Sequence, residues 1–167
     1  MAKSTDIRVV GTQLFFLPVE TRVPLKFGPE TLTHVTCARA RLTVQLADGR
    51  TANGWGETPL SVQWVWPSAL PYEPRHEALK EFCQHLAKAW SEFDAIGHPL
   101  ELGHDFQQTE LPRLLAEFNQ VQTAGEPIPW LAALVCCSLF DIALHDALGQ
   151  ALGQATYDTY SAEYLSR

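Results

Sequence analysis

At 167 residues, the chain is long enough to bury the core of one domain and too short for two domains of ordinary size. Its net charge is -7, and its 12 basic residues are scattered singly along the sequence. This pattern argues against a nucleic-acid partner, because an acidic surface repels phosphate backbones. The uncharged run between Pro127 and Asp141 is 13 residues, shorter than the roughly 20 that span a bilayer, so no membrane segment is expected.

The cysteines and the N-terminus indicate a cellular compartment. The four cysteines form no CxxC pair, which favours reduced thiols in the core of a cytosolic protein. They are Cys37, Cys83, Cys136 and Cys137. The first six residues contain no apolar run, so no secretory signal is visible. We therefore expect a cytoplasmic location.

The first third of the chain has strand patterns. Residues 7–17 are rich in β-branched and aromatic side chains and end at Pro18, which predicts a strand. Residues 18–34 contain three prolines and a glycine, so we expect a long loop there. Residues 37–47 alternate strictly between apolar and polar side chains, which predicts a second strand with one buried face. The apolar set is Ala38, Ala40, Leu42, Val44 and Leu46.

A turn and a third strand complete the sheet. Asp48-Gly49 is a strong hairpin signal, and residues 51–57 can return as the partner strand. Residues 58–73 form a proline-punctuated segment with several aromatic side chains, Trp64 and Trp66 among them. We expect a loop that covers, or is covered by, another part of the protein.

Three helices are expected after this loop. The first begins at Glu73-Pro74 and ends near residues 97–99, and a shorter one covers about 110–122 with Pro112 in its first turn. The longest covers residues 130–149, and its apolar side chains occupy most of its circumference, so other elements must cover it. Strands followed by helices indicate an α+β fold, with a three-stranded antiparallel sheet (β-meander) and a bundle of about three helices.

The polar positions of the long helix are the first candidates for chemistry. Asp141 and His145 are four residues apart and can meet on one helical face, but no ligand spacing completes a metal site around them. A polar seam between packed elements is the better interpretation. The loop histidines His98 and His104 are expected to be solvated.

Two motifs carry a family resemblance. The segment Ser138-Leu-Phe-Asp-Ile-Ala-Leu-His-Asp-Ala-Leu-Gly-Gln-Ala-Leu-Gly153 resembles the A-x-D-I-A-L-W-D-x-x-G-K-x-x-G helix of the N-terminal capping domain in the enolase superfamily, in its mandelate racemase and muconate lactonizing group. His145 replaces the usual Trp, and Gln150 the usual Lys. Gly54-Trp55-Gly56-Glu57 resembles the G-x-G-E that ends the third strand of that domain. The resemblance implies a capping domain over residues 1–157, with 158–167 as a tail or the start of a linker to a (β/α)₈ barrel.

The resemblance also implies a role for two segments. In that family, the loops after the first and third strands close over the substrate, excluding water rather than performing bond chemistry. The corresponding substrate-capping residues here are Arg22, Lys26, Phe27, Glu57, Trp64 and Trp66. The residues alone favour a β-bulge or a close backbone approach for Gly54 and Gly56. For Glu57, a solvated strand-end carboxylate is as good an interpretation as a substrate contact.

The catalytic groups of the family belong to its barrel, which supplies lysine or histidine bases and three acidic Mg²⁺ ligands. The lysines of this chain fit no such pattern, and the chain ends where the first barrel strand is expected. We therefore expect no catalytic residue, no metal site and no cofactor here. For the full-length enzyme, the resemblance implies Mg²⁺, the C-terminal barrel as partner and a small carboxylate substrate that loses its α-proton. Apolar surface on the long helix also predicts a homo-oligomer.

A second hypothesis belongs to a different functional class. The chain could be a free-standing protein-interaction module that docks through the apolar helix 130–149 and the loop of Trp64 and Trp66. The coding sequence downstream of Arg167 separates the two hypotheses. An open frame with a Lys-x-Lys strand and three spaced acidic residues supports the capping domain, whereas a stop codon favours the module.

Overall fold

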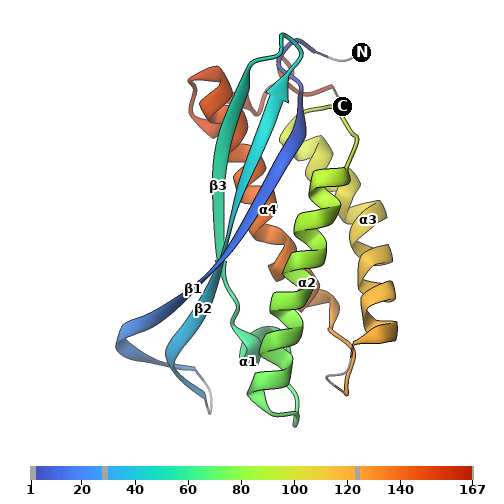
Figure 1. Cartoon of the computed structure of the whole chain (residues 1–167). Coiled ribbons are helices and arrows are strands. Elements are labelled where there is room, and N and C mark those ends of the chain that lie inside the picture. The colour runs from blue at the N-terminus through green and yellow to red at the C-terminus, as the bar shows by residue number, and fades with distance from the viewer. Residues whose placement is uncertain (1–2, 28–29, 123–124, 167) are drawn as a thin grey trace.

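A computed structural model describes residues 3–27, 30–122 and 125–166. The elements are β1 (Ile7–Phe27), β2 (Glu30–Leu46), β3 (Thr51–Pro59), α1 (Val62–Val65), α2 (Tyr72–Glu92), α3 (Pro99–Val121), α4 (Trp130–Leu152) and the 3₁₀ helix η1 (Thr156–Thr159). The strands form an antiparallel sheet in the order β1-β2-β3. Helices α2 and α4 pack on one face of the sheet, and α3 packs outside them (Figure 1). The expected α+β fold, a meander followed by three main helices, is confirmed.

The second strand carries the sheet side of the core, as its alternation predicts. Its five apolar side chains face the helices and are almost completely buried. The predicted hairpin turn is also present, with Gly49 at a φ of 87°, a backbone conformation that glycine adopts without a steric penalty. The Asp48 side chain accepts the N–H of Arg50 at 3.0 Å, which stabilises the turn.

The loop predicted for residues 18–34 is wrong, because most of this segment is strand. β1 and β2 continue pairing beyond Leu17 and form a long two-stranded arm, which we define as residues 18–27 and 30–35 (Figure 1). The register shifts between Glu20 and Leu25, and Pro24 lies within this irregularity. A proline is tolerated at a bulge because no ladder hydrogen bond is required of it there. Pro24 therefore marks a bulge rather than a loop, and Pro18 pairs with Thr36 within the regular ladder.

The segment between β3 and α2 is more ordered than a loop. It contains α1, a single helical turn whose Val62 and Val65 are buried. The next helix, α2, starts at Tyr72 and ends at Glu92, earlier than the predicted end near residues 97–99. The chain is extended at Phe93, and Gly97 pairs with Ile7 beside the sheet.

The predicted start of α3 is wrong by about eleven residues, because the helix begins at Pro99 rather than near Glu110. His98 and Glu101 form a capping box at its N-terminus, and Pro99 suits the first helical turn. Consequently, Pro112 lies inside the helix and not in its first turn. The helix also contains Gly103, at which a Cβ atom would lie 2.2 Å from Asp141 Oδ1.

The long helix α4 is the centre of the core. It begins at Trp130 as predicted, continues to Leu152 and ends with Gly153 in the left-handed conformation. Among the described helices, α4 is long and apolar enough to cross a membrane by length and composition alone. More than half of its most apolar stretch is buried against the sheet and the other helices, which is the behaviour of a core helix.

Candidate functional site

The two segments that resemble capping loops lie at the same end of the molecule. The arm and α1 are both at the bottom of Figure 1, whereas the N- and C-termini meet at the opposite end. At the base of the arm, Thr36 pairs with Pro18, and its carbonyl accepts the N–H of Leu60, which precedes α1, at 2.8 Å. Strand pairing thus holds this end of the domain together, although the two segments are far apart in sequence.

The tip of the arm exposes both apolar and basic side chains. Val23 is 70% exposed and Leu25 is 56% exposed, and Arg22 and Lys26 are also exposed. The side chain of Phe27, another predicted capping residue, lies outside the described part of the chain. Exposed aliphatic groups beside cationic groups are suited to contact a ligand that carries both an apolar part and a carboxylate.

The two predicted tryptophans have different environments. Trp64 on α1 is 57% exposed, whereas Trp66 is only 3% exposed and belongs to the core. The buried guanidinium of Arg75 donates to the carbonyl oxygens of Trp66 and Pro71, the latter at 3.2 Å. These bonds fix the segment between α1 and α2, so that Trp64 is presented from a rigid turn.

A hollow of about 450 Å³ lies between the base of the arm and the start of α2. Its lining includes Val19, Glu20 and His34 from the arm and Tyr72 and His76 from α2. The ring of His76 stacks on that of Tyr72, with centroids 5.3 Å apart, and its Nε2 lies 2.9 Å from the hydroxyl of Thr36. Burial lowers the pKa of His76, with Glu77 acting in the opposite direction, and burial raises the pKa of Tyr72.

Glu57 belongs to a different hollow, of about 390 Å³, lined by Arg39, Trp55, Gly56, Glu57 and Ile142. Its carboxylate accepts a hydrogen bond from Arg39 Nε at 2.6 Å, and the two residues are directly opposite each other on β2 and β3. The lining of this hollow includes no residue of the arm or of α1. The structure therefore brings the arm and Trp64 to one end but does not bring Glu57 into the same hollow.

The glycines of the Gly54-Trp55-Gly56-Glu57 motif allow β3 and α4 to approach backbone to backbone. A Cβ atom at Gly54 would lie 2.1 Å from the carbonyl oxygen of Ala143, and one at Gly56 would lie 1.9 Å from that of Leu139. Between them, the N–H of Trp55 donates to Asp146 Oδ2 at 2.8 Å. The expected close backbone approach is confirmed. The motif at residues 54–57 and the motif at residues 138–153 therefore contact each other.

Sequence reasoning missed a polar cluster at the other end of the molecule. His98 was expected to be solvated but is 2% exposed, because its ring is an N-cap and packs under the C-terminal segment. His145 Nδ1 is hydrogen-bonded to the hydroxyl of Tyr160 at 2.8 Å rather than pairing with Asp141. The capping pattern His-Pro-x-Glu at residues 98–101 was the available signal.

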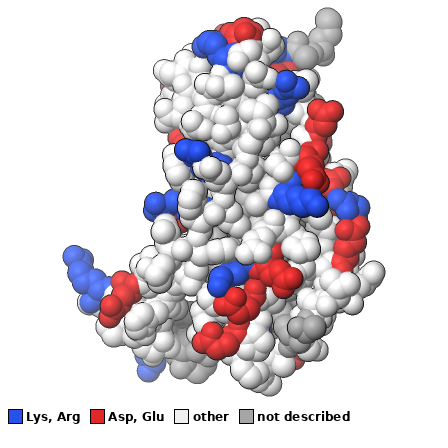
Figure 2. All heavy atoms as spheres, in the orientation of Figure 1, with Lys and Arg blue, Asp and Glu red and all other residues white. Residues whose placement is uncertain are grey.

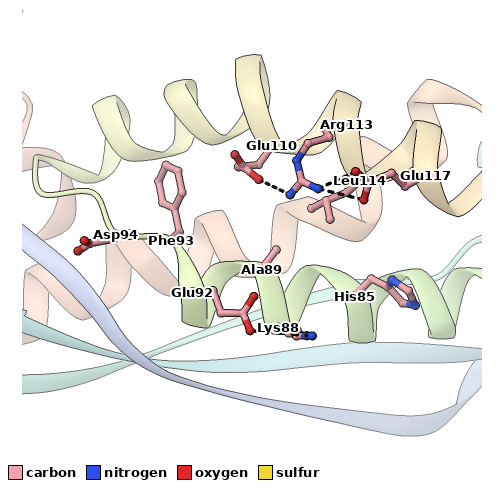
Figure 3. Close-up of a pocket in the computed structure, with 10 residues that line it drawn as sticks. All are labelled: His85, Lys88, Ala89, Glu92, Phe93, Asp94, Glu110, Arg113, Leu114 and Glu117. Atoms are coloured by element: carbon pink, nitrogen blue, oxygen red, sulfur yellow. Dashed lines mark hydrogen bonds and ion pairs between the residues drawn. The ribbon is translucent and has the colours of Figure 1, made fainter.

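Another hollow, of about 510 Å³, lies between α2 and α3 and is lined mainly by charged side chains. In Figure 3, Arg113 on one wall bridges Glu110 and Glu117, while Lys88 and Glu92 stand on the other. Acidic groups lie mainly over the helices on the face shown in Figure 2. Within the part of the chain that the structure describes, no three His, Cys, Asp or Glu side chains gather as metal ligands.

Comparison with solved structures finds this fold in part of two enolase-superfamily enzymes. One is a dipeptide epimerase from Cytophaga hutchinsonii, complexed with Mg and the dipeptide D-Ala-L-Val. It is 19% identical with a TM-score of 0.51, and the match covers 90% of this chain and 32% of that chain. The other is an enolase from Bradyrhizobium, complexed with magnesium and mandelic acid. It is 14% identical with a TM-score of 0.52, and the match covers 93% of this chain and 35% of that chain.

These matches confirm the resemblance at the level of fold. The chain has the architecture of one part of these enzymes and spans about a third of their length. No protein-family model matches the chain, and no curated protein sequence matches it significantly. The chain matches only part of those enzymes, so their activity can only be proposed for this protein.

Proposed function

We propose that the chain is the capping domain of an enolase-superfamily enzyme and that the arm and α1 close over the substrate held by a (β/α)₈ barrel. The observation that carries this proposal is the convergence of the arm and Trp64 at one end of a fold shared with two such enzymes. The basic groups of Arg22 and Lys26 are suited to attract a carboxylate substrate. Trp64 and the aliphatic tip of the arm would exclude water from it.

In the whole protein, we propose that Mg²⁺ assists the removal of a proton α to the carboxylate, which gives an enediolate. That intermediate can lead to racemisation, epimerisation, cycloisomerisation or dehydration, and residues of the barrel decide which. The two similar structures contain magnesium, which supports this cofactor for the full-length enzyme. The described residues of this chain form no metal-ligand cluster, so its own contribution is to position and to shield the substrate.

The test begins with the coding sequence downstream of the Arg167 codon. We expect an open frame with a Lys-x-Lys strand and three spaced acidic residues. The protein encoded by the whole frame, with Mg²⁺, should exchange the α-proton of carboxylates for deuterium in D₂O, as followed by proton NMR. The 167-residue chain alone should be inert. A stop codon at that position, or exchange catalysed by the 167-residue chain itself, would contradict the proposal.

The alternative hypothesis is a free-standing interaction module that docks through α4 and the loop of Trp64 and Trp66. It is disfavoured, because α4 is largely covered and Trp66 is buried. The exposed apolar groups left at this helix include Trp130 and Leu131. We propose that they support a homo-oligomer, which sedimentation analysis over a range of concentrations would test. The four buried free thiols support a cytoplasmic location.

A further inference from the structure

A buried polar cluster holds the C-terminal segment, residues 154–166, against the start of α3. His98 Nδ1 accepts the N–H of Leu100 at 3.2 Å, and its Nε2 lies 3.2 Å from the hydroxyl oxygen of Thr159. Because Nδ1 is an acceptor, the proton of the neutral ring must be on Nε2, which donates to Thr159. Thr159 in turn donates to the carbonyl of Thr156 at 2.7 Å. The neutral form of His98 therefore satisfies this whole chain of hydrogen bonds.

A second histidine fixes the same segment from α4. His145 Nδ1 lies 2.8 Å from the hydroxyl oxygen of Tyr160, within hydrogen-bond distance. The rings of His98, His145 and Tyr160 meet edge to face, and the centroids of the two histidines are 6.2 Å apart. Two positive charges at this distance in a partly buried site would repel each other.

The rest of the segment is tied down by groups that do not depend on histidine. Lys3 Nζ donates to the carbonyl oxygens of Ala162, Glu163 and Leu165 at 2.6 to 2.9 Å. The N–H of Ser166 donates to Glu101 Oε1 at 2.8 Å. These contacts define where a released segment would first separate, namely at residues 156–160.

Charged and titratable groups face His98 from every element around it. They are Asp6 before β1, Glu101 on α3, His145 on α4 and Tyr160 in the C-terminal segment. Burial lowers the pKa of His98 most, and the charge of His145 lowers it further, against the weaker effects of Glu101 and Asp6. Burial also lowers the pKa of His145, whose neighbour Asp141 on the same helix has its pKa raised by burial.

We propose that His98 and His145 form a pH-sensitive latch, which holds residues 156–160 against the domain at neutral pH and releases them as the pH falls below about 6, where free imidazoles become charged. Protonation of His98 Nδ1 removes the acceptor for the Leu100 N–H. It also places a charge beside His145. The closed latch binds fewer protons than the released one, so acid favours release.

Hydrogen exchange of the 167-residue chain at pH 7.5 and pH 5.0 tests the latch. Rates are divided by the intrinsic rate at each pH, and the probes are the hydrogen-bonded amides of Asp158 and Tyr160. We expect protection of residues 156–160 to fall about tenfold or more at pH 5.0, while β2 keeps its protection. Unchanged protection of residues 156–160 between the two pH values would overturn the proposal.

Variants distinguish release caused by protonation of His98 and His145 from a general loss of protection in acid. The double variant His98→Asn and His145→Phe retains a helix-capping side chain and an aromatic ring but cannot be protonated, so its segment should show less than a twofold change. His104→Asn is the control, because His104 lies on α3 with an exposed side chain, and it should behave as the unmodified chain does. If the double variant loses protection at pH 5.0 as the unmodified chain does, the proposal is wrong.

A milder variant keeps the test decisive if the double variant folds poorly. Tyr160→Phe removes only the hydroxyl that is hydrogen-bonded to His145. We expect a several-fold loss of protection in residues 156–160 at pH 7.5, with β2 unchanged. Full protection in this variant would also count against the latch.

Discussion

In the body of the domain, β3 and α4 meet backbone to backbone, whereas the outer part of the arm exposes Val23 and Leu25 to solvent. At the first contact there is no space for another carbon atom, so the sequence is fixed by packing. At the arm, strand pairing requires little of the side chains, and the sequence is free to vary. Side chains at the tip of the arm can therefore be replaced with little cost in stability.

The largest effect should come from adding one carbon atom to the close contact. Gly56→Ala places a Cβ 1.9 Å from the carbonyl oxygen of Leu139, so β3 or α4 must move, and we expect a loss of about 3 kcal/mol or more in unfolding free energy. Gly11→Ala is the matched control, because its Cβ would lie at an ordinary 3.6 Å from Thr43 Cβ. Urea denaturation measures both, and equal stabilities would contradict the packing of α4 on β3.

The body of the domain was predictable because its signals are periodic. The alternation from Ala38 to Leu46 has one solution that buries the apolar face, and all five side chains are buried. The apolar circumference of α4 likewise required cover on several sides. Both family motifs proved to be the two partners of a single contact, which is why their order and spacing were informative.

The arm, the start of α3 and the latch could not be predicted in the same way. Prolines in residues 18–27 indicate a loop when pairing is unknown, but Pro18 pairs with Thr36 and Pro24 lies at the observed bulge. At the start of α3, Gly103 is a poor helix former that is explained by Asp141 of another helix. The environment of His98 depends on Thr159, 61 residues away. Contacts distant in sequence leave no local pattern.

Acid should destabilise the body more than the arm. The pKa values of His76, His98 and His145 are lowered in the folded chain, first by burial, so the unfolded chain binds more protons below its imidazole pKa of about 6.5. This contribution to stability is complete above about pH 6.5 and is lost as the pH falls towards the lowered values, with a slope of at most about 1.4 kcal/mol per pH unit for each proton. Urea denaturation at pH 7.5 and 5.5 measures the loss. A chain equally stable at both values would contradict it.

A smaller effect is expected where α4 holds the edge of β3 by one hydrogen bond. Asp146→Ala removes the acceptor for the Trp55 N–H and should cost about 1 kcal/mol of unfolding free energy. Asp146→Asn keeps a carbonyl oxygen at that position and should cost less. Asp94→Ala, at an exposed position, is the control and should remain within about 0.5 kcal/mol of the unmodified chain. If Asp146→Ala behaved like Asp94→Ala, the hydrogen bond would contribute nothing to stability.

The smallest effect on stability should come from the proposed capping residues themselves. Substitutions there should lower activity and leave the unfolding free energy nearly unchanged. Trp64→Ala and Arg22→Ala remove exposed side chains and should each change the unfolding free energy by less than about 0.5 kcal/mol. Trp66→Ala, two residues from Trp64 but buried, should cost about 3 to 5 kcal/mol.

In the full-length enzyme that we propose, Trp64→Ala and Arg22→Ala should each lower kcat/KM about tenfold, the effect of losing about 1.4 kcal/mol of transition-state binding. Lys88→Ala is the control, because its side chain is exposed on α2 and lines the hollow between α2 and α3, and it should leave kcat/KM unchanged. Steady-state assays of the three variants together decide the role of this end of the domain. Full activity in both Trp64→Ala and Arg22→Ala would show that the arm and α1 do not contact the substrate. Equal losses in all three variants would point to a general defect of the folded protein instead.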